Sequence, residues 1–361
     1  MHDASSTRTA RPRKFSRFGA AVLAVVLAAA LTTGIAFGDD GDDRDDENGR
    51  AAYTVGLWGD VPYSADQATA GVPNLIVDMN RAKLAFSVHA GDIKSGGSRC
   101  DNPVYTQFEN YLNSLRAPAF YTPGDNEWTD CDRPTNGPYL SSERLAYIRA
   151  NLFDTPSSHG RKQMRVEVQA APYIENRRWS KGRVTYATLH VVGSDNNRSG
   201  DVAPDPVEWA ARNDATNRWL QETFAEAKRH HAAGVLLVIQ ANPGFDASDP
   251  TRAPVRDPRT LGPDDGFFSF LRTLRAETIA FGKPVVLVHG DSHYFRVDKP
   301  LQDASGTRIE HFTRVETPGN NAQSGSNDVQ WVSVAVNPGD PEVFSFQQEV
   351  VAENVPAAYQ P

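Results

Sequence analysis

The sequence is poor in the features that mark several common protein classes. Among its 361 residues are only two cysteines, Cys100 and Cys131, too few to supply the four ligands of a structural zinc site. It has no Gly-x-Ser-x-Gly motif, which argues against a Ser-His-Asp hydrolase built on that motif. The formal net charge is −8, so we expect no nucleic-acid binding driven by attraction to phosphates.

The N-terminal region differs in composition from the rest of the chain. Basic residues between Arg8 and Arg17 precede an apolar stretch from Phe18 to Gly38, a pattern typical of an export signal. The stretch is about long enough to span a bilayer, so residues 1–38 are either a signal peptide or an N-terminal membrane anchor. In either case the basic flank predicts that the remainder is exported, as a secreted protein or one anchored at the outer face of the cytoplasmic membrane. We expect membrane contact only through this segment.

Three further regions follow. Residues 39–50 are acidic and polar, so we expect a disordered linker. Residues 51–350 have the composition and length of one globular domain, and we find no internal repeat in them. Residues 351–361 are expected to form a C-terminal tail with a frayed end.

The domain begins with an alternation of strands and helices. Short apolar runs predict strands over 53–57, 84–89 and 118–121, and helical spacing of apolar residues predicts helices over 65–82 and 105–115. This order indicates parallel strands joined by right-handed crossovers.

The remainder of the domain mixes strand patterns with longer helices. The predicted helices are 141–152, 206–231 and 264–281, and the predicted strands are 164–168, 173–179, 184–192, 235–240, 284–289, 312–316, 329–336 and 343–346. The whole indicates two sheets packed face to face with helices outside.

Four short Asp-centred segments each end a predicted strand. They are Gly59-Asp60, Gly91-Asp92, Gly124-Asp125-Asn126-Glu127 and Gly290-Asp291-Ser292-His293. Each alone also fits an ordinary turn, because Gly allows positive φ and Asp caps helices. Together they favour one site, because the carboxyl ends of neighbouring parallel strands face a common crevice. Carboxylates with one imidazole suit a divalent cation.

The order of these segments resembles that of the calcineurin-like metallophosphoesterase family, over about residues 57–300. In this resemblance Asp60 matches the family's first metal-binding Asp, Asp92 the Asp that bridges two metals, and His293 the second His of the final motif. The resemblance implies an α/β fold, a four-layer α-β-β-α sandwich of two mixed sheets flanked by helices. It also implies a phosphoesterase that uses one or two divalent cations.

Several positions depart from the family pattern. Asp125 occupies the position of the family's Asn ligand, and Asn126 occupies that of its catalytic His. Asp291 occupies the position of the first His of the family's final motif. Asn242 falls in the strand end where the family has another His. Pro62 stands where a His would follow Asp60, although Tyr63 beside it could reach inward.

The substitutions change the expected chemistry. The implied metal ligands become Asp60, Asp92, Asp125, Asn242, Asp291 and His293. A set dominated by carboxylate and amide oxygens favours Mn²⁺, Mg²⁺ or Ca²⁺ over zinc or iron.

The resemblance implies hydrolysis of a phosphate mono- or diester, on a small molecule or at a surface, by a metal-activated water. The candidate catalytic residues are Asn126, His293 and Glu127, and the candidate substrate contacts are Asn126, Asn196 and Asn197. The loss of the catalytic His keeps an alternative open, a catalytically impaired member that binds a ligand or partner at the cell surface.

The cysteines fit the same arrangement. An even cysteine count in an exported protein predicts a disulfide between Cys100 and Cys131, with two free thiols as the alternative. Because each follows an Asp segment by a few residues, this bridge would tie two loops of the candidate site together.

Overall fold

The computed structural model describes residues 51–137, 139–244, 262–320 and 329–355. The expected signal or anchor over 1–38, the acidic linker over 39–50 and the end of the tail lie outside these ranges. Within them, no helix combines the length and apolar character needed to cross a bilayer.

The first sheet contains the strands that carry three of the Asp segments. Its order is β12-β11-β1-β2-β3, with β1 (Tyr53–Trp58), β2 (Phe86–His89) and β3 (Ala119–Tyr121) parallel to one another. The antiparallel strands β11 (Trp331–Val336) and β12 (Phe344–Glu349) complete it. Trp58 pairs with His89, and His89 with Tyr121, so the three parallel strands end level and their following loops share one edge.

The second sheet has seven strands in the order β4-β5-β6-β7-β8-β10-β9. Its parallel centre consists of β6 (Val184–Thr188), β7 (Gly234–Val238), β8 (Val285–His289) and β10 (Phe312–Glu316). The antiparallel strands are β4 (Glu167–Val168), β5 (Arg177–Lys181) and β9 (Arg296–Asp298). Every residue of β7 and β8 is buried, as expected for parallel strands covered on both faces.

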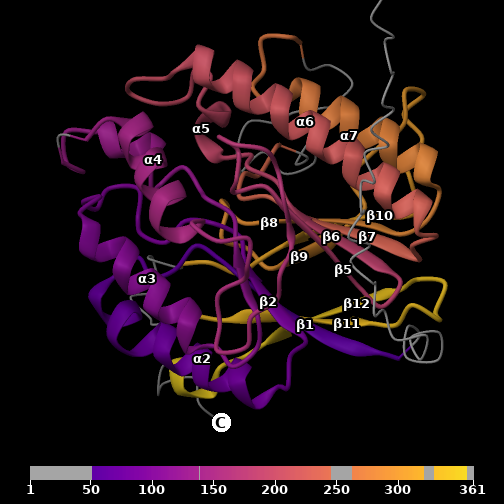
Figure 1. Cartoon of the computed structure of the whole chain (residues 1–361), viewed down its shortest axis with the longest axis horizontal. Helices are drawn as coiled ribbons and strands as arrows, with labels where there is room; N and C mark the ends of the chain where they lie inside the picture. The colour runs from indigo at the N-terminus through magenta and orange to yellow at the C-terminus, as the bar shows by residue number, and fades with distance from the viewer. Residues whose placement is uncertain (1–50, 138, 245–261, 321–328, 356–361) are drawn as a thin grey trace, which may run out of the picture. The chain divides into compact units, whose positions relative to one another are not determined.

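Helices cover the outer faces of both sheets (Figure 1). The α-helices are α2 (Val72–Arg81), α3 (Asn102–Ser114), α4 (Ser141–Leu152), α5 (Gly193–Asn196), α6 (Pro206–Arg229) and α7 (Phe268–Phe281). Shorter helical segments are η1 (Gln67–Gly71), η2 (Thr129–Asp132) and η4 (Ala352–Asn354).

Three apolar cores separate four layers. One core lies between the sheets, where Leu57 and Val88 of the first sheet share a cluster with Leu236 and Val286 of the second. A second core joins the first sheet to α2, α3 and α4. A third joins the second sheet to α6 and α7. The predicted four-layer sandwich of two mixed sheets flanked by helices is therefore confirmed.

Most element predictions agree with the structure, and the differences have local causes. Helix 141–152 and strand 312–316 have the predicted bounds. The strand predicted over 173–179 begins instead at Arg177, because Tyr173 and Asn176 close successive turns through backbone hydrogen bonds. Helix α7 begins at Phe268 rather than at Asp264, because Asp265 first closes a turn onto the Gly262 carbonyl. The edge strand β9 was not predicted.

Cys100 and Cys131 form a disulfide, with their Cα atoms 5.7 Å apart. Cys100 lies in the loop between Asp92 and α3, and Cys131 lies in η2, shortly after Asp125. The bridge therefore joins the loops that follow β2 and β3.

Replacing both cysteines by serine should destabilise the protein. The bridge closes a loop with a sequence separation of 31, and the loss of that constraint on the unfolded chain costs about 3–4 kcal/mol. Chemical denaturation of the full chain and of the Cys100→Ser/Cys131→Ser variant measures the difference. A reductant should destabilise the first and leave the second unchanged. Equal free energies of unfolding would contradict this prediction.

Candidate functional site

The four Asp segments meet at the edge where the parallel strands of both sheets end. Asp60, Asp92 and Asp125 follow β1, β2 and β3, and Asp291 follows β8 of the other sheet. The Asp291 backbone N–H donates to Asp60 Oδ1 at 2.9 Å, although 231 residues separate the two in sequence. His293 Nε2 lies 3.6 Å from the same oxygen. The sheets thus bring together residues that the sequence placed only at separate strand ends.

Asp92 is held by two side chains. The Tyr63 hydroxyl donates to Asp92 Oδ2 at 2.9 Å, and Asn126 Nδ2 donates to the same oxygen at 2.8 Å. Asn126 Nδ2 also lies 2.7 Å from the Tyr63 hydroxyl oxygen, which can accept from it. The ring of Tyr63 packs edge-on against that of His293, with centroids 5.2 Å apart. Tyr63 therefore reaches into the site from beside Pro62, the position where the resemblance led us to expect a His.

Asp125 joins the same cluster from the other side. Ser194 Oγ, in the short helix α5 after β6, donates to Asp125 Oδ2 at 2.8 Å. Asp125 is buried, and its Oδ1 has no hydrogen-bond partner among the described residues.

Two glycines make room for carboxylates that belong to other strands. A Cβ atom at Gly124 would overlap Asp92 Oδ1, and a Cβ atom at Gly290 would overlap Asp60 Oδ2. In both of these Gly-Asp pairs, the Asp belongs to the acid cluster and the Gly leaves room for an Asp that follows a different strand.

Four of the candidate ligands have an unusual backbone. The φ angles of Asp60, Asp92, Asp291 and His293 are 56°, 62°, 74° and 67°, in the left-handed region that non-glycine residues rarely occupy. Such conformations cost of order 1–3 kcal/mol each, and they concentrate at functional sites. Their coincidence at one edge supports a site rather than a set of ordinary turns.

Three acids of the cluster, Asp60, Asp92 and Asp291, have a raised pKa and hold their protons more tightly than ordinary carboxyls. Burial, together with the charges of the other acids, raises the pKa of Asp60 and of Asp92 well above the usual value. Burial and the charge of Asp125 raise the pKa of Asp291 to about 7. Burial lowers the pKa of His293, so this imidazole is neutral, the form that binds metals. A cation would relieve the repulsion that adds to burial in raising the pKa values of these acids.

The donor set fits a hard cation, although the side chains are not drawn together around one point. Two buried carboxylate oxygens, Asp60 Oδ2 and Asp125 Oδ1, have no hydrogen-bond partner within the described ranges. Unpaired buried oxygens of this kind are costly unless a cation or water satisfies them. In the described part of the chain, no group of three or more His, Cys, Asp or Glu side chains has the geometry of a ready-made metal site. Side-chain movement would have to accompany cation binding.

Glu127 lies behind the site and joins its loops. It is fully buried, and its Oε1 accepts from the backbone N–H of Gly124 at 2.7 Å, from that of Asp92 at 3.3 Å and from the Tyr121 hydroxyl at 2.5 Å. These contacts fix the loops after β2 and β3 relative to each other. These contacts support a positioning role for Glu127, and the proton-carrying role stays a prediction.

Asn196 and Asn197, which were predicted to contact the substrate, are both buried among other parts of the protein. Asn196 Oδ1 accepts from Arg212 Nη1 at 2.7 Å, and its Nδ2 donates to the Gly266 carbonyl at 3.2 Å. Asn197 Nδ2 donates to Glu208 Oε2 at 2.9 Å. Both side chains therefore bind residues in the first half of α6. This geometry does not support a contact with a substrate, which stays a prediction.

Asn242 adjoins the site through its backbone. Its N–H donates to Asp291 Oδ2 at 2.9 Å, its Oδ1 accepts from the Gly244 N–H at 3.0 Å, and its Nδ2 donates to Ser292 Oγ at 2.6 Å. Asn242 therefore positions the Asp291 segment, and metal binding through its amide oxygen stays a prediction.

Three further residues of the site are not among those predicted from the sequence as site residues. Ser194 contacts Asp125, and Gln240 Oε1 accepts from the Gly193 N–H at 2.7 Å. Lys94 is buried two residues after Asp92, where burial lowers its pKa and the charges of Glu127 and Asp130 oppose that shift. The first two follow the ends of β6 and β7, so the rule that identified the Asp segments could have found them.

Comparisons with known proteins give remote structural similarities. No protein-family model matches the chain, and no curated protein matches its sequence. Similar solved structures include GAP50, the anchor in the inner membrane complex of Plasmodium (10% identity, TM-score 0.47, covering 83% of this chain and 89% of that one). A dimetal phosphatase from Danio rerio gives 13% identity and a TM-score of 0.45, covering 83% of this chain and 99% of that one.

A third similar structure is the purple acid phosphatase PPD1 from yellow lupin (Lupinus luteus) seeds. It gives 12% identity and a TM-score of 0.45, covering 83% of this chain but only 54% of the lupin chain, so this chain matches about half of that protein. At TM-scores this low, the three similarities assign no residue role, metal or reaction to this chain.

Substituting Gly124 by alanine should disturb Asp92 without removing any acid. The new Cβ atom would overlap Asp92 Oδ1, and overpacking of this kind costs about 1–3 kcal/mol. Gly97→Ala is the matched control, because a Cβ atom there meets nothing within 4 Å. Denaturation and Mn²⁺ titration of both variants test this. Equal stability and Mn²⁺ affinity in the two variants would show that the close approach is unimportant.

The cation-free protein should lose stability as the pH rises from about 4 to about 7. Folded Asp291 keeps its proton up to a pKa of about 7, whereas an unfolded Asp loses it near about 4. Over that range the folded state binds more protons than the unfolded state, so rising pH favours unfolding. Thermal denaturation in a chelator measures this dependence. Asp291→Asn should reduce this dependence, with Asp60 and Asp92 still contributing to it, whereas Asp214→Asn, at an exposed position on α6, should leave it unchanged.

Proposed function

We propose that this protein is an exported, cation-dependent phosphoesterase that hydrolyses a phosphate mono- or diester. The observation that supports this most directly is the convergence of Asp60, Asp92, Asp125 and Asp291 from two sheets, where two of their buried oxygens have no hydrogen-bond partner in the described part of the chain. A bound divalent cation would polarise a phosphoryl oxygen and make a bound water more acidic.

The residues that would hold a cation are Asp60, Asp92, Asp125 and Asp291, with neutral His293 beside Asp60. Oxygen ligands dominate this set, so we infer that Mn²⁺, Mg²⁺ or Ca²⁺ is preferred to zinc or iron. Among the described residues that surround these acids, Tyr63, Ser194 and the backbone N–H of Asp291 and Asn242 fix the carboxylate orientations.

The role of Asn126 follows from its chemistry. A carboxamide cannot transfer a proton at ordinary pH, so Asn126 cannot protonate a leaving group. Its Nδ2 instead donates to Asp92 Oδ2 and to the Lys94 carbonyl, which orients the carboxylate. Without an acid at this position, the enzyme should prefer substrates whose leaving group departs unprotonated, such as aryl phosphates over alkyl phosphates.

The experiment measures hydrolysis of p-nitrophenyl phosphate and bis-p-nitrophenyl phosphate by the full chain with added Mn²⁺, Mg²⁺ or Ca²⁺. We expect cation-stimulated turnover, and we expect Asp92→Asn to lower kcat/KM by about a hundredfold or more, since even residues outside the ligand shell of metal enzymes contribute about 10–100-fold. Asp214→Asn, at an exposed position on α6, should retain full activity.

The absence of Asp92-dependent turnover on either ester would refute the proposal. If such a protein still bound a cation, as seen by a rise in melting temperature on adding Mn²⁺, the alternative of a catalytically impaired ligand-binding module would replace it. Metal analysis of the purified protein separates that alternative from a site that binds no cation.

A further inference from the structure

A cavity lies at the opposite edge of the first sheet, where β2 and β3 begin. Its lining includes Ala85, directly before β2, and Pro118, directly before β3. Its volume is about 580 Å³, within the range of about 300–1,000 Å³ usual for small-molecule sites. The candidate cation site lies past the other ends of the same strands, so the two do not share residues.

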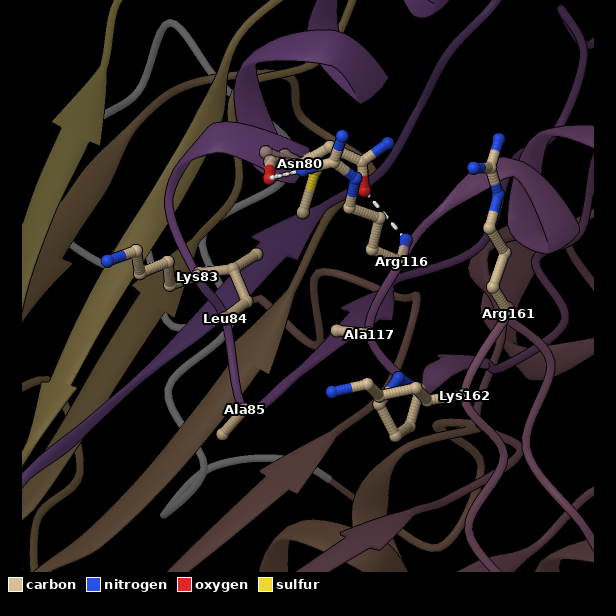
Figure 2. Close-up of a pocket in the computed structure, with 10 residues that line it drawn as sticks. Asn80, Lys83, Leu84, Ala85, Arg116, Ala117, Arg161 and Lys162 are labelled. Carbon is tan, nitrogen blue, oxygen red and sulfur yellow. Dashed lines mark hydrogen bonds between the residues drawn. The ribbon is translucent and has the colours of Figure 1, made fainter.

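The lining combines an apolar floor with basic side chains. Met79, Leu84, Ala85, Ala117 and Pro118 supply the apolar part, and Lys83, Arg116, Arg161 and Lys162 supply four positive charges; Asn80 completes the lining, which contains no acid. Figure 2 shows Lys83 and Leu84 on one side, Arg161 and Lys162 on the other, and Arg116 and Ala117 between them.

Backbone contacts fix the chain segments that carry Arg116, Arg161 and Lys162, whose side chains are exposed. The Arg161 N–H donates to the Leu115 carbonyl at 2.8 Å, and the Lys162 N–H donates to the Arg116 carbonyl at 3.2 Å. Gly160, with φ of +94°, makes this approach possible, because a Cβ atom there would overlap the Ala117 carbonyl. Across the cavity, Asn80 Oδ1 accepts from the Arg116 N–H at 2.6 Å (Figure 2). The walls are therefore fixed by three chain segments.

The four charges are not neutralised by the surrounding protein. Among the described residues, no carboxylate forms an ion pair with Lys83, Arg116, Arg161 or Lys162. Most other arginines of the described body do have such partners, including Arg144, Arg149 and Arg212. A concave surface lined by charge of one sign concentrates ligands of the other sign, and this one occurs in a chain of net charge −8.

We propose that this cavity binds a phosphate-bearing ligand that also has an apolar part. Arginine pairs with phosphate oxygens through two parallel hydrogen bonds, and lysine adds point charge. Two arginines and two lysines suit a ligand with more than one negative charge, while the floor from Met79 to Pro118 suits an apolar body. The cavity is remote from the Asp cluster, so this proposal does not depend on the proposed hydrolysis.

The test measures binding to the full chain by calorimetry, in a chelator so that no cation recruits phosphate to the Asp cluster. The probes are inorganic pyrophosphate, dihexanoyl phosphatidic acid and, as the probe without net charge, dihexanoyl phosphatidylcholine. The variant is Arg161→Glu/Lys162→Glu, at two exposed positions. Its control is Arg272→Glu/Arg275→Glu on α7, which packs on the other sheet and receives the same change of charge.

We expect phosphatidic acid to bind more tightly than pyrophosphate, and phosphatidylcholine to bind least. The cavity variant should weaken the binding of both anions by about tenfold or more, a loss of about 1.4 kcal/mol, and the control variant should leave it nearly unchanged. A preference for phosphatidic acid would support the apolar part of the proposed ligand and a lipid headgroup as the source of the phosphate. Equal affinities would overturn that part, because they would show an anion site that makes no use of the apolar floor.

Three results would overturn the proposal: no binding of either anion, equal binding of phosphatidylcholine, or anion binding that the cavity variant leaves unchanged. The neutral variant Arg161→Gln/Lys162→Gln guards against misfolding of the charge-reversed one. It should show a smaller loss in the same direction, with an unchanged circular dichroism spectrum.

Discussion

The mutual repulsion of acids buried where the two sheets meet is the constraint around which this edge of the molecule is organised. Asp60 and Asp92 are buried within range of each other's charge and of Asp125 and Asp291. Such a group is stable only if protons, hydrogen-bond donors or a cation compensate it. The chain supplies donors from Tyr63, Ser194 and the backbone, but Asp60 Oδ2 and Asp125 Oδ1 find no hydrogen-bond partner among the residues that the structure describes. This deficit is the strongest physical indication of a cation.

The same constraint explains why the loops around the acids depend on one another. Gly124 of the β3 loop makes room for Asp92 of the β2 loop, and Gly290 of the second sheet makes room for Asp60 of the first. Glu127 and the Cys100–Cys131 disulfide then connect the β2 and β3 loops a second and a third time. No loop at this edge can move alone, so the left-handed backbone of its acids is held by neighbours rather than by local preference.

The sequence predicted the elements of the fold better than the contacts of the site. Helix 141–152 could be predicted because its apolar residues recur at helical spacing, and the strand ends could be located because each apolar run stops at a Gly-Asp pair. The contact between Asp291 and Asp60 crosses 231 residues and two sheets, which no local pattern encodes. The contacts of Glu127 were hidden for a related reason: two of its three donors, Gly124 and Tyr121, are near in sequence, but the one that joins the β2 loop, Asp92, is 35 residues away.

The first sheet has opposite charges at its two edges. Its parallel strands β2 and β3 begin at the basic cavity of Lys83, Arg116, Arg161 and Lys162 and end at Asp92 and Asp125. A net charge of −8 conceals this separation, because it sums both edges. The separation means that an anion and a cation are attracted to different ends of the same strands, so the ligands of the two edges need not compete for one surface.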